Sequence, residues 1–440
     1  MATKLGPHVL KAAPDIGEYI QAGPAVAKFV DELGMAVNVP EGVLVIGRDF
    51  QGSYDAQLQK NSGKSPREAA QQFIQDQQGT YQANPHIKYW EGHNEPVWNA
   101  EEGMGWYAQF EVERMKLMTE MGLKCVIGNF ATGAPALDLW PAFLPALRAA
   151  KRHQAILGLH EYSCPWMWWM TGKHQLDPEA DEGDEGWTTL RYRKVYRQHL
   201  IPNGLGDVPL AITECGLDPL VNPKPPHSPA GAWKQLGNFW AKEDEEPSKS
   251  DYYFRQLVWY DKELQKDDYV IGATIFTWGS WGGAWANFDV AGTEVAKKLI
   301  SYTQKDPGRP FKYPDIDDDV DEDIDDVVDD NEKGDEEAKK SRGQPRVQYE
   351  RTYVLLPPNA DSAWARAVME STWDEKRYTV GSSADDAGIG DLDRRRVIAV
   401  NPQEWSGPQS LEAFFEKYYP HVEYQFITAG TPEELKQRLN

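Results

Sequence analysis

The feature that most constrains the fold is an alternation of short strand-like runs with longer helical stretches, from the start of the chain to about residue 310. Helical stretches are predicted at residues 66–78, 103–121, 190–200 and 252–265. Eight strands are predicted around them, at residues 6–10, 25–30, 43–47, 88–91, 124–129, 155–160, 209–213 and 270–276. This α/β pattern favours a (β/α)8 TIM barrel, a closed parallel barrel ringed by helices. An open doubly wound sheet is the alternative, but no GxGxxG or Walker loop follows any strand.

The composition changes sharply after the predicted barrel, and it divides the chain into three segments. Residues 1–312 form the predicted barrel, 313–345 an acidic low-complexity linker, and 346–440 a small α/β accessory domain. Residues 315–337 alone carry a net charge of −14, out of −23 for the whole chain. A stretch this acidic cannot bury enough apolar surface to fold alone. Its Asp runs could recruit Ca²⁺, but they lack the Gly and the spaced Glu of an EF-hand loop, so a solvated linker is favoured.

The last segment regains the character of a folded domain. Strands are predicted at residues 353–356, 396–400 and 424–427, and helices at 362–370, 410–418 and 432–439, which makes three βα units. None of its turns has a recognisable catalytic pattern. A non-catalytic accessory or binding role is therefore expected.

Charge and cysteine content limit the classes of partner. An acidic chain is not expected to bind nucleic acid or anionic membranes, and no apolar run is long enough to cross a bilayer. Cys125, Cys164 and Cys215 lack metal-ligand spacing and lie in apolar runs, which predicts buried free thiols and no metal site. The first residues show no signal peptide, and the location of the protein stays open.

Polar residues follow the predicted strands at the end where barrel enzymes hold their catalytic groups. Asn94 and Glu95 follow the fourth strand, His160 and Tyr162 the sixth, and Glu214 the seventh. Two carboxylates across one barrel mouth suit the cleavage of a glycosidic bond, since one can protonate the leaving oxygen while the other attacks the anomeric carbon. Glu91 is expected to point away from the mouth, and Glu161 toward the outer helices.

The Asn94-Glu95-Pro96 turn and the Thr213-Glu214-Cys215-Gly216 segment resemble those of the large clan of retaining barrel glycosidases that includes cellulases, mannanases and β-xylosidases. The resemblance covers about the first 300 residues. It implies that Glu95 is the acid/base and Glu214 the nucleophile. It further implies that Asn94 holds the substrate 2-hydroxyl, that Tyr162 or His160 bonds the nucleophile, and that Trp278 lies beneath the reacting sugar.

The sequence departs from this clan at the end of the second strand, where many members carry an Arg that supports the nucleophile. Arg48, after the third strand, is the nearest candidate. Exposed indoles on barrel loops are typical of saccharide clefts. We therefore also expect Trp98, Trp166 and Trp281 to contact substrate.

These observations predict an enzyme that hydrolyses β-linked oligo- or polysaccharides with net retention, without metal or organic cofactor. Two other functions stay open: a catalytically inactive barrel that binds polysaccharide, and a surface or assembly protein that depends on the linker and the last segment. The sequence does not reveal the sugar.

Overall fold

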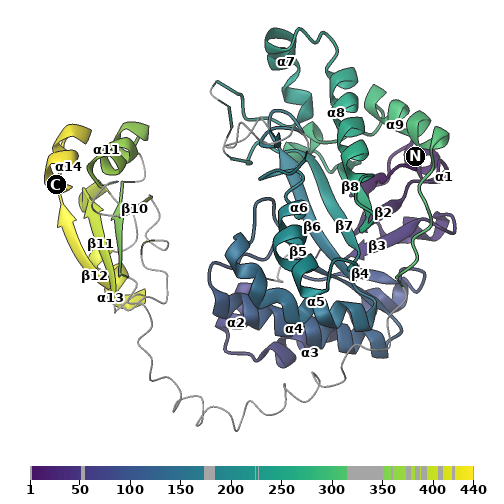
Figure 1. Ribbon diagram of the computed structural model, residues 1–440, viewed down its shortest axis with the longest axis horizontal. Coiled ribbons are helices and arrows are strands. Elements are labelled where there is room, and N and C mark those ends of the chain that lie inside the picture. The colour runs from purple at the N-terminus through teal and green to yellow at the C-terminus, as the bar shows by residue number, and fades with distance from the viewer. Residues whose placement is uncertain are drawn as a thin grey trace. The chain divides into compact units, whose positions relative to one another are not determined.

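The structure, a computed structural model, describes residues 2–50, 55–172, 184–222, 224–225, 227–314, 350–357, 360–372, 378–381, 387, 394–404, 410–418 and 422–439. The chain divides into two compact units, Met1–Val320 and Asp321–Asn440 (Figure 1). Apart from residues 313 and 314, the predicted acidic linker lies outside the described residues, as does its possible Ca²⁺ binding.

The first unit is built on a closed barrel of eight parallel strands that follow one another in chain order. The predicted barrel is confirmed, and every predicted strand is present to within a few residues. The strands are β1 (Leu5–Val9), β2 (Val26–Val30), β3 (Leu44–Arg48), β4 (Tyr89–Glu91), β5 (Lys124–Phe130), β6 (Ile156–Ser163), β7 (Leu210–Leu217) and β8 (Val270–Trp278). Their side chains are buried almost throughout, as expected for strands covered on both faces.

Helices surround the barrel (Figure 1). The longer ones are α3 (Pro66–Ala83), α4 (Glu101–Glu120), α5 (Trp140–His153), α8 (Lys249–Leu264) and α9 (Glu294–Lys305). The shorter ones are α1 (Ile16–Gln21), η1 (Leu33–Asn38), α2 (Ala56–Asn61), η2 (Leu137–Leu139), α6 (Tyr192–Val195), η4 (Tyr196–Leu200), η5 (Ile201–Asn203), η6 (Trp233–Gln235), α7 (Gly237–Glu243) and η7 (Gly283–Asn287). The helix predicted at 190–200 is thus a short α-helix continued by one π-helical turn.

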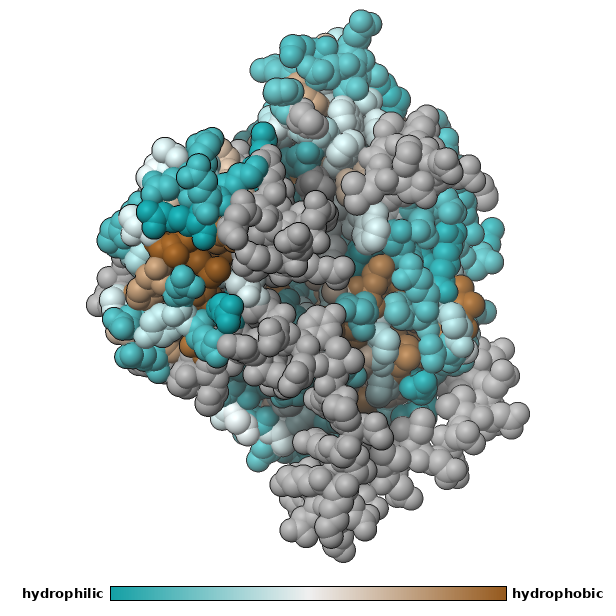
Figure 2. Space-filling model, turned by 60° about the vertical axis from the view of Figure 1, so that its left-hand side comes forward, coloured by the Kyte–Doolittle hydropathy of each residue, from teal (hydrophilic) through white to brown (hydrophobic). Residues whose placement is uncertain are grey.

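The surface of the described residues is mostly hydrophilic on the face that Figure 2 shows, with a few separate apolar patches. No helix among the described residues combines the length and the apolar character needed to cross a membrane. The three cysteines are buried and free, as predicted.

The second unit contains a four-stranded parallel sheet in the order β10-β9-β11-β12. Its elements are β9 (Glu350–Leu355), α11 (Ser362–Thr372), β10 (Tyr378–Gly381), β11 (Arg394–Val400), η9 (Pro402–Glu404), α13 (Leu411–Tyr418), β12 (Val422–Ile427) and α14 (Pro432–Leu439). Apolar clusters cover both faces of the sheet, one with α13 and the other with α11 and α14. The prediction of three βα units was wrong by one strand, because the four residues of β10 are too few to show a pattern.

A buried ion pair fastens α4 to the strands beside it. The guanidinium of Arg114 donates to the Glu111 carboxylate at 2.7 Å, to the carbonyl oxygen of Val126 at 2.8 Å and to that of Trp90 at 3.3 Å. Because Trp90 belongs to β4, these bonds fix the strand that leads into the turn holding Glu95.

The change Arg114→Leu is expected to lower the free energy of unfolding by about 3–5 kcal/mol, since it leaves the Glu111 carboxylate buried without its cation. On the same helix, Lys116 pairs with Glu113 near the surface at 3.3 Å, and Lys116→Leu should cost less than about 1 kcal/mol. Urea denaturation of both variants measures the difference. Equal losses would show that the buried pair is not what holds α4.

Candidate active site

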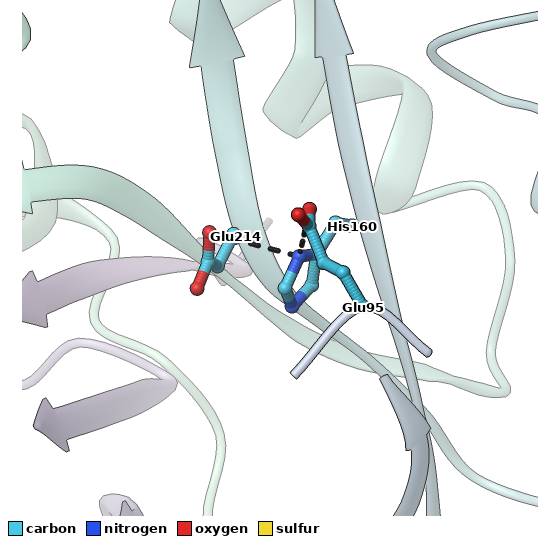
Figure 3. A group of neighbouring side chains, drawn as sticks. All are labelled: Glu95, His160 and Glu214. Atoms are coloured by element: carbon cyan, nitrogen blue, oxygen red, sulfur yellow. Dashed lines mark hydrogen bonds and ion pairs between the residues drawn. The ribbon is translucent and has the colours of Figure 1, made fainter. Parts of the chain in front are cut away.

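The mouth of the barrel gathers polar side chains from most of its strands. They are Lys28 (β2), Arg48 (β3), Glu95 (the loop after β4), His160 and Tyr162 (β6) and Glu214 (β7). Figure 3 shows the imidazole of His160 between the carboxylates of Glu95 and Glu214. The predicted pair of carboxylates is therefore brought together, with Arg48, His160 and Tyr162 beside it.

Glu214 is buried and has a partner on each carboxylate oxygen. Its Oε1 lies 3.1 Å from Lys28 Nζ and 3.3 Å from a terminal nitrogen of Arg48, and its Oε2 accepts the Tyr162 hydroxyl at 2.8 Å. Burial alone would raise the pKa of Glu214. The nearby His160, Lys28 and Arg48 outweigh burial and hold this pKa well below its usual value, so the carboxylate is ionised at neutral pH.

Glu95 lies in a different environment. Its backbone has a φ of 48°, a left-handed conformation uncommon for a residue with a side chain, and its N–H donates to the carbonyl oxygen of Asn129 at 3.0 Å. The side chain is 39% exposed, and its Oε1 lies 2.8 Å from Nδ1 of His160. The turn thus holds this carboxylate at the open side of the mouth.

The two carboxylates are close enough to act on one bond. One oxygen from each, together with a ring nitrogen of His160, lie within 4.8 Å of one another. His160 Nδ1 is 3.6 Å from Glu214 Oε2. One carboxylate is enclosed among cations while the other is open to solvent, so the two lie in different environments.

The spacing of Glu95, His160 and Glu214 would by itself suit a metal ion. The charges beside them oppose it, because Lys28 and Arg48 already place two cations within 3.3 Å of Glu214. A divalent cation there would be repelled at short range in a poorly hydrated site. The site is better suited to an organic substrate.

Lys28 and Glu91 belong to the site and were missed by sequence reasoning. Lys28 Nζ lies 2.9 Å from Glu91 Oε2, and both side chains are fully buried. The expectation that Glu91 points away was wrong, since its carboxylate lies inside the barrel with Arg48 3.7 Å away. In the sequence, the visible sign of Lys28 is a lysine within the apolar run at 26–30, but the sequence did not reveal its partner.

Glu161 does face the outer helices, as predicted, and accepts the Tyr260 hydroxyl at 2.6 Å.

The aromatic residue at the mouth end of β8 is Phe276, and the expectation for Trp278 was wrong. His8 pairs with Phe276 but the next residue of β1, Val9, pairs with Trp278, so Thr277 is an extra residue in β8. Such a bulge breaks the alternation of side chains. Phe276 faces Tyr162, with ring centroids 6.1 Å apart.

Trp278 instead lies in the layer of α1. It is 0% exposed, its ring stacks on Tyr19 at 4.6 Å, and its indole N–H donates to Asp15 at 2.9 Å. The indole of Trp278 is fully buried and its N–H already has an acceptor, so neither face of the ring can stack on a sugar.

The other expected binding residues have mixed placements. Asn94 is exposed, and its side-chain oxygen accepts a hydrogen bond from Arg48. Trp98 is a core residue packed against Tyr107, so the expectation that it contacts substrate was wrong. Trp166 is half-buried and donates to Asp244 at 2.9 Å, which directs it toward α7 rather than the cleft beside Glu95. Trp281 is 66% exposed on the loop after β8.

A cleft of about 860 Å³ opens beside Glu95 and Tyr162. It is formed by the loops after β5, β6 and β7, and Asp138, Trp187 and Asp218 line it. Trp187 was not predicted as a binding residue.

No protein-family model and no curated protein matches the sequence. Among solved structures, the chain is similar to a GH2 β-galacturonidase from Eisenbergiella tayi, with 12% identity and a TM-score of 0.43 over 72% of this chain and 52% of that one. It is also similar to a GH128 endo-β-1,3-glucanase from Pseudomonas viridiflava, with 14% identity and a TM-score of 0.36 over 68% of this chain and 97% of that one. A third similar structure is a β-glucosidase from Exiguobacterium marinum, with 11% identity and a TM-score of 0.37 over 66% of this chain and 85% of that one. The chain thus spans about half the length of the galacturonidase. At these identities and TM-scores, the three structures do not indicate a function for this chain.

Trp278→Ala is expected to lower the free energy of unfolding by about 3–5 kcal/mol, because it empties a closed space beside Tyr19. Trp281→Ala removes an indole of the same size from the surface and should change stability by less than about 0.5 kcal/mol. Thermal or urea unfolding of the two variants makes the comparison. If Trp278→Ala left the free energy of unfolding unchanged, Trp278 would again be a candidate for substrate binding.

Proposed function

We propose that the protein is a glycoside hydrolase that cleaves β-linked oligo- or polysaccharides by a retaining double displacement. Glu214 is the nucleophile and Glu95 the general acid/base. The observation that carries this proposal is the pair of carboxylates itself. One is enclosed and ionised, the other is accessible, and one oxygen of each lies within 4.8 Å of the other. Retaining enzymes hold their two carboxyl groups roughly 5–5.5 Å apart, whereas inverting enzymes need roughly 6.5–9.5 Å to admit a water.

The first step forms a covalent bond between Glu214 and the sugar. A carboxylate oxygen of Glu214 attacks the anomeric carbon, and the bond to the leaving oxygen breaks as Glu95 donates its proton to that oxygen. In the second step Glu95 removes a proton from water, the water oxygen attacks the same carbon, and Glu214 leaves as a carboxylate. Two inversions return the β configuration.

The neighbouring groups support these roles. Lys28, Arg48 and Tyr162 bond the form of Glu214 that attacks, and they stabilise its charge again when it leaves. Asn94 accepts from Arg48 through its side-chain oxygen, so its amide N–H groups face outward as donors for a sugar hydroxyl. Phe276 supplies an apolar ring beside Tyr162.

The cleft beside Glu95 would hold the leaving group, because that residue protonates the leaving oxygen. At about 860 Å³ it lies in the upper part of the roughly 300–1,000 Å³ common for ligand sites. The indole of Trp187, which is 37% exposed and has Lys194 Nζ over its ring, lines it. This size supports a saccharide rather than a small alcohol. A panel of β-glucan, mannan, xylan, galactan and bacterial surface polysaccharides identifies the sugar.

We also propose the division into a catalytic barrel (1–312), a linker (313–345) and an accessory domain (346–440). The separation into two compact units supports it. A non-catalytic role for the second unit fits the placement of all the proposed catalytic groups in the first.

Replacing the two carboxylates should have different effects. Glu214→Ala should abolish turnover of every substrate. Glu95→Ala should still release dinitrophenolate from an aryl glycoside, since this leaving group needs no proton, and azide should then restore turnover with a β-glycosyl azide as product. Release of dinitrophenolate and the configuration of the azide product are the measurements. An α-azide from Glu95→Ala, or a β-azide from Glu214→Ala, would exchange the two roles, and near-normal activity of both variants would contradict the proposal.

The acid limb of the pH profile should report the charges around Glu214. Catalysis needs this carboxylate ionised, and its pKa is held below the usual 4.5, so kcat/KM should fall only below that pH. Arg48→Met removes one cation and should move the acid limb to higher pH. Lys60→Met removes a cation paired with Glu102 at the surface and should leave the limb in place. If the acid limb lies at the same pH in both variants, Arg48 does not lower the pKa of Glu214.

A further inference from the structure

Glu91 is a third carboxylate in the mouth, and the double displacement described above does not use it. It shares both cations of the site with the nucleophile. Lys28 Nζ lies 2.9 Å from Glu91 Oε2 and 3.1 Å from Glu214 Oε1, while a terminal nitrogen of Arg48 lies 3.7 Å and 3.3 Å from the same two atoms. Two anions and two cations thus form one cluster without net charge.

The position of Glu91 excludes it from bond making. Its side chain is 0% exposed, compared with 8% for Glu214 and 39% for Glu95. Neither of its oxygens accepts a hydrogen bond of normal geometry from a described residue. What Glu91 contributes to the cluster is therefore its charge.

That charge becomes necessary once the nucleophile reacts. Glu214 is an anion in the free protein, but it is an uncharged ester in the glycosyl-enzyme. Lys28 has no exposure to water and Arg48 very little. Without Glu91 the intermediate would hold two enclosed cations with no carboxylate paired to them among the described residues, since the carboxylate of Glu95 lies at the open side and pairs with His160. Unpaired buried charge is costly.

The other ionisable groups against this cluster do not replace Glu91. Burial, followed by the charge of Lys28, lowers the pKa of His8 well below its usual value, so His8 is uncharged. Burial, followed by the charge of Glu214, raises the pKa of Tyr162 well above its usual value, so the phenol keeps its proton. Among the described residues paired with Lys28 and Arg48, the only carboxylates are Glu91 and Glu214.

We propose that Glu91 is a positioning residue that serves as the counter-ion of Lys28 and Arg48 while Glu214 carries the sugar. The inference rests on the proposed function, since it requires the covalent intermediate. It predicts that Glu91 acts oppositely on the two steps. Loss of its charge disfavours every state in which Glu214 is neutral, the intermediate fully and the transition states in part.

The test uses a 2-deoxy-2-fluoro β-glycoside of the sugar that the substrate panel identifies, with dinitrophenolate as leaving group. Such a compound separates the steps, because inactivation reports formation of the glycosyl-enzyme and recovery of activity reports its hydrolysis. In Glu91→Gln the inactivation rate should fall on the order of ten-fold, while recovery should be as fast as in the unchanged protein or faster.

Glu91→Asp is the matched control, because it keeps the charge and shortens the side chain, whereas Glu91→Gln keeps the shape and loses the charge. The ratio of the two rates in Glu91→Asp should stay within about three-fold of the unchanged protein. Both rates are taken on the active fraction, so partial unfolding does not change their ratio.

Parallel slowing of both steps in Glu91→Gln would overturn the inference and indicate a structural role. So would unchanged rates, or a greater change of the ratio in Glu91→Asp than in Glu91→Gln. A different result concerns the proposed function: if mass spectrometry finds no sugar on the Glu214 peptide of the unchanged protein, the retaining mechanism itself fails.

Discussion

The ammonium group of Lys28, enclosed within the barrel, determines how the mouth is built. A buried cation is stable only beside anions, and here β4 and β7 each supply one. Glu214 is thereby ionised through the fold rather than through contact with water. Glu95 projects from a turn and keeps its carboxylate in contact with solvent. Two identical side chains acquire different chemistry because the chain places one inside the charged cluster and the other at its edge.

Much of this could be predicted from the sequence. Apolar runs separated by helical stretches predict eight strands, and the number of crossovers predicts their closure into a barrel. Strand ends then locate the candidate site, which is why Glu95, Glu214 and His160 could be named as candidates that the structure brings together. Arg48 was found as the residue directly after the third predicted strand. These predictions succeeded because each depends on local pattern and on a rule that holds for all parallel barrels.

The placement of the residues that were missed depends on the register of the barrel strands, which a single sequence does not reveal. Lys28 and Glu91 are visible as charges within strands, but their pairing follows from how β2, β4 and β7 are staggered. Trp278 was misplaced because side-chain alternation was assumed to continue to the end of β8. In the second unit, β10 was missed because four residues between turns carry no periodic signal.

Two bulges, one in β7 and one in β8, limit how this barrel can be altered. In β7, Ile212 pairs with Leu159 of β6 and Glu214 with His160, so Thr213 is an extra residue just before Glu214, as Thr277 is in β8. Removing either threonine would turn every later side chain of its strand to the opposite face. Residues at the mouth ends of β7 and β8 can be exchanged, but the number of residues in these two strands is fixed. Insertions and deletions compatible with activity therefore belong in the loops beyond Leu217 and Trp278, where a change of length leaves the paired strands untouched.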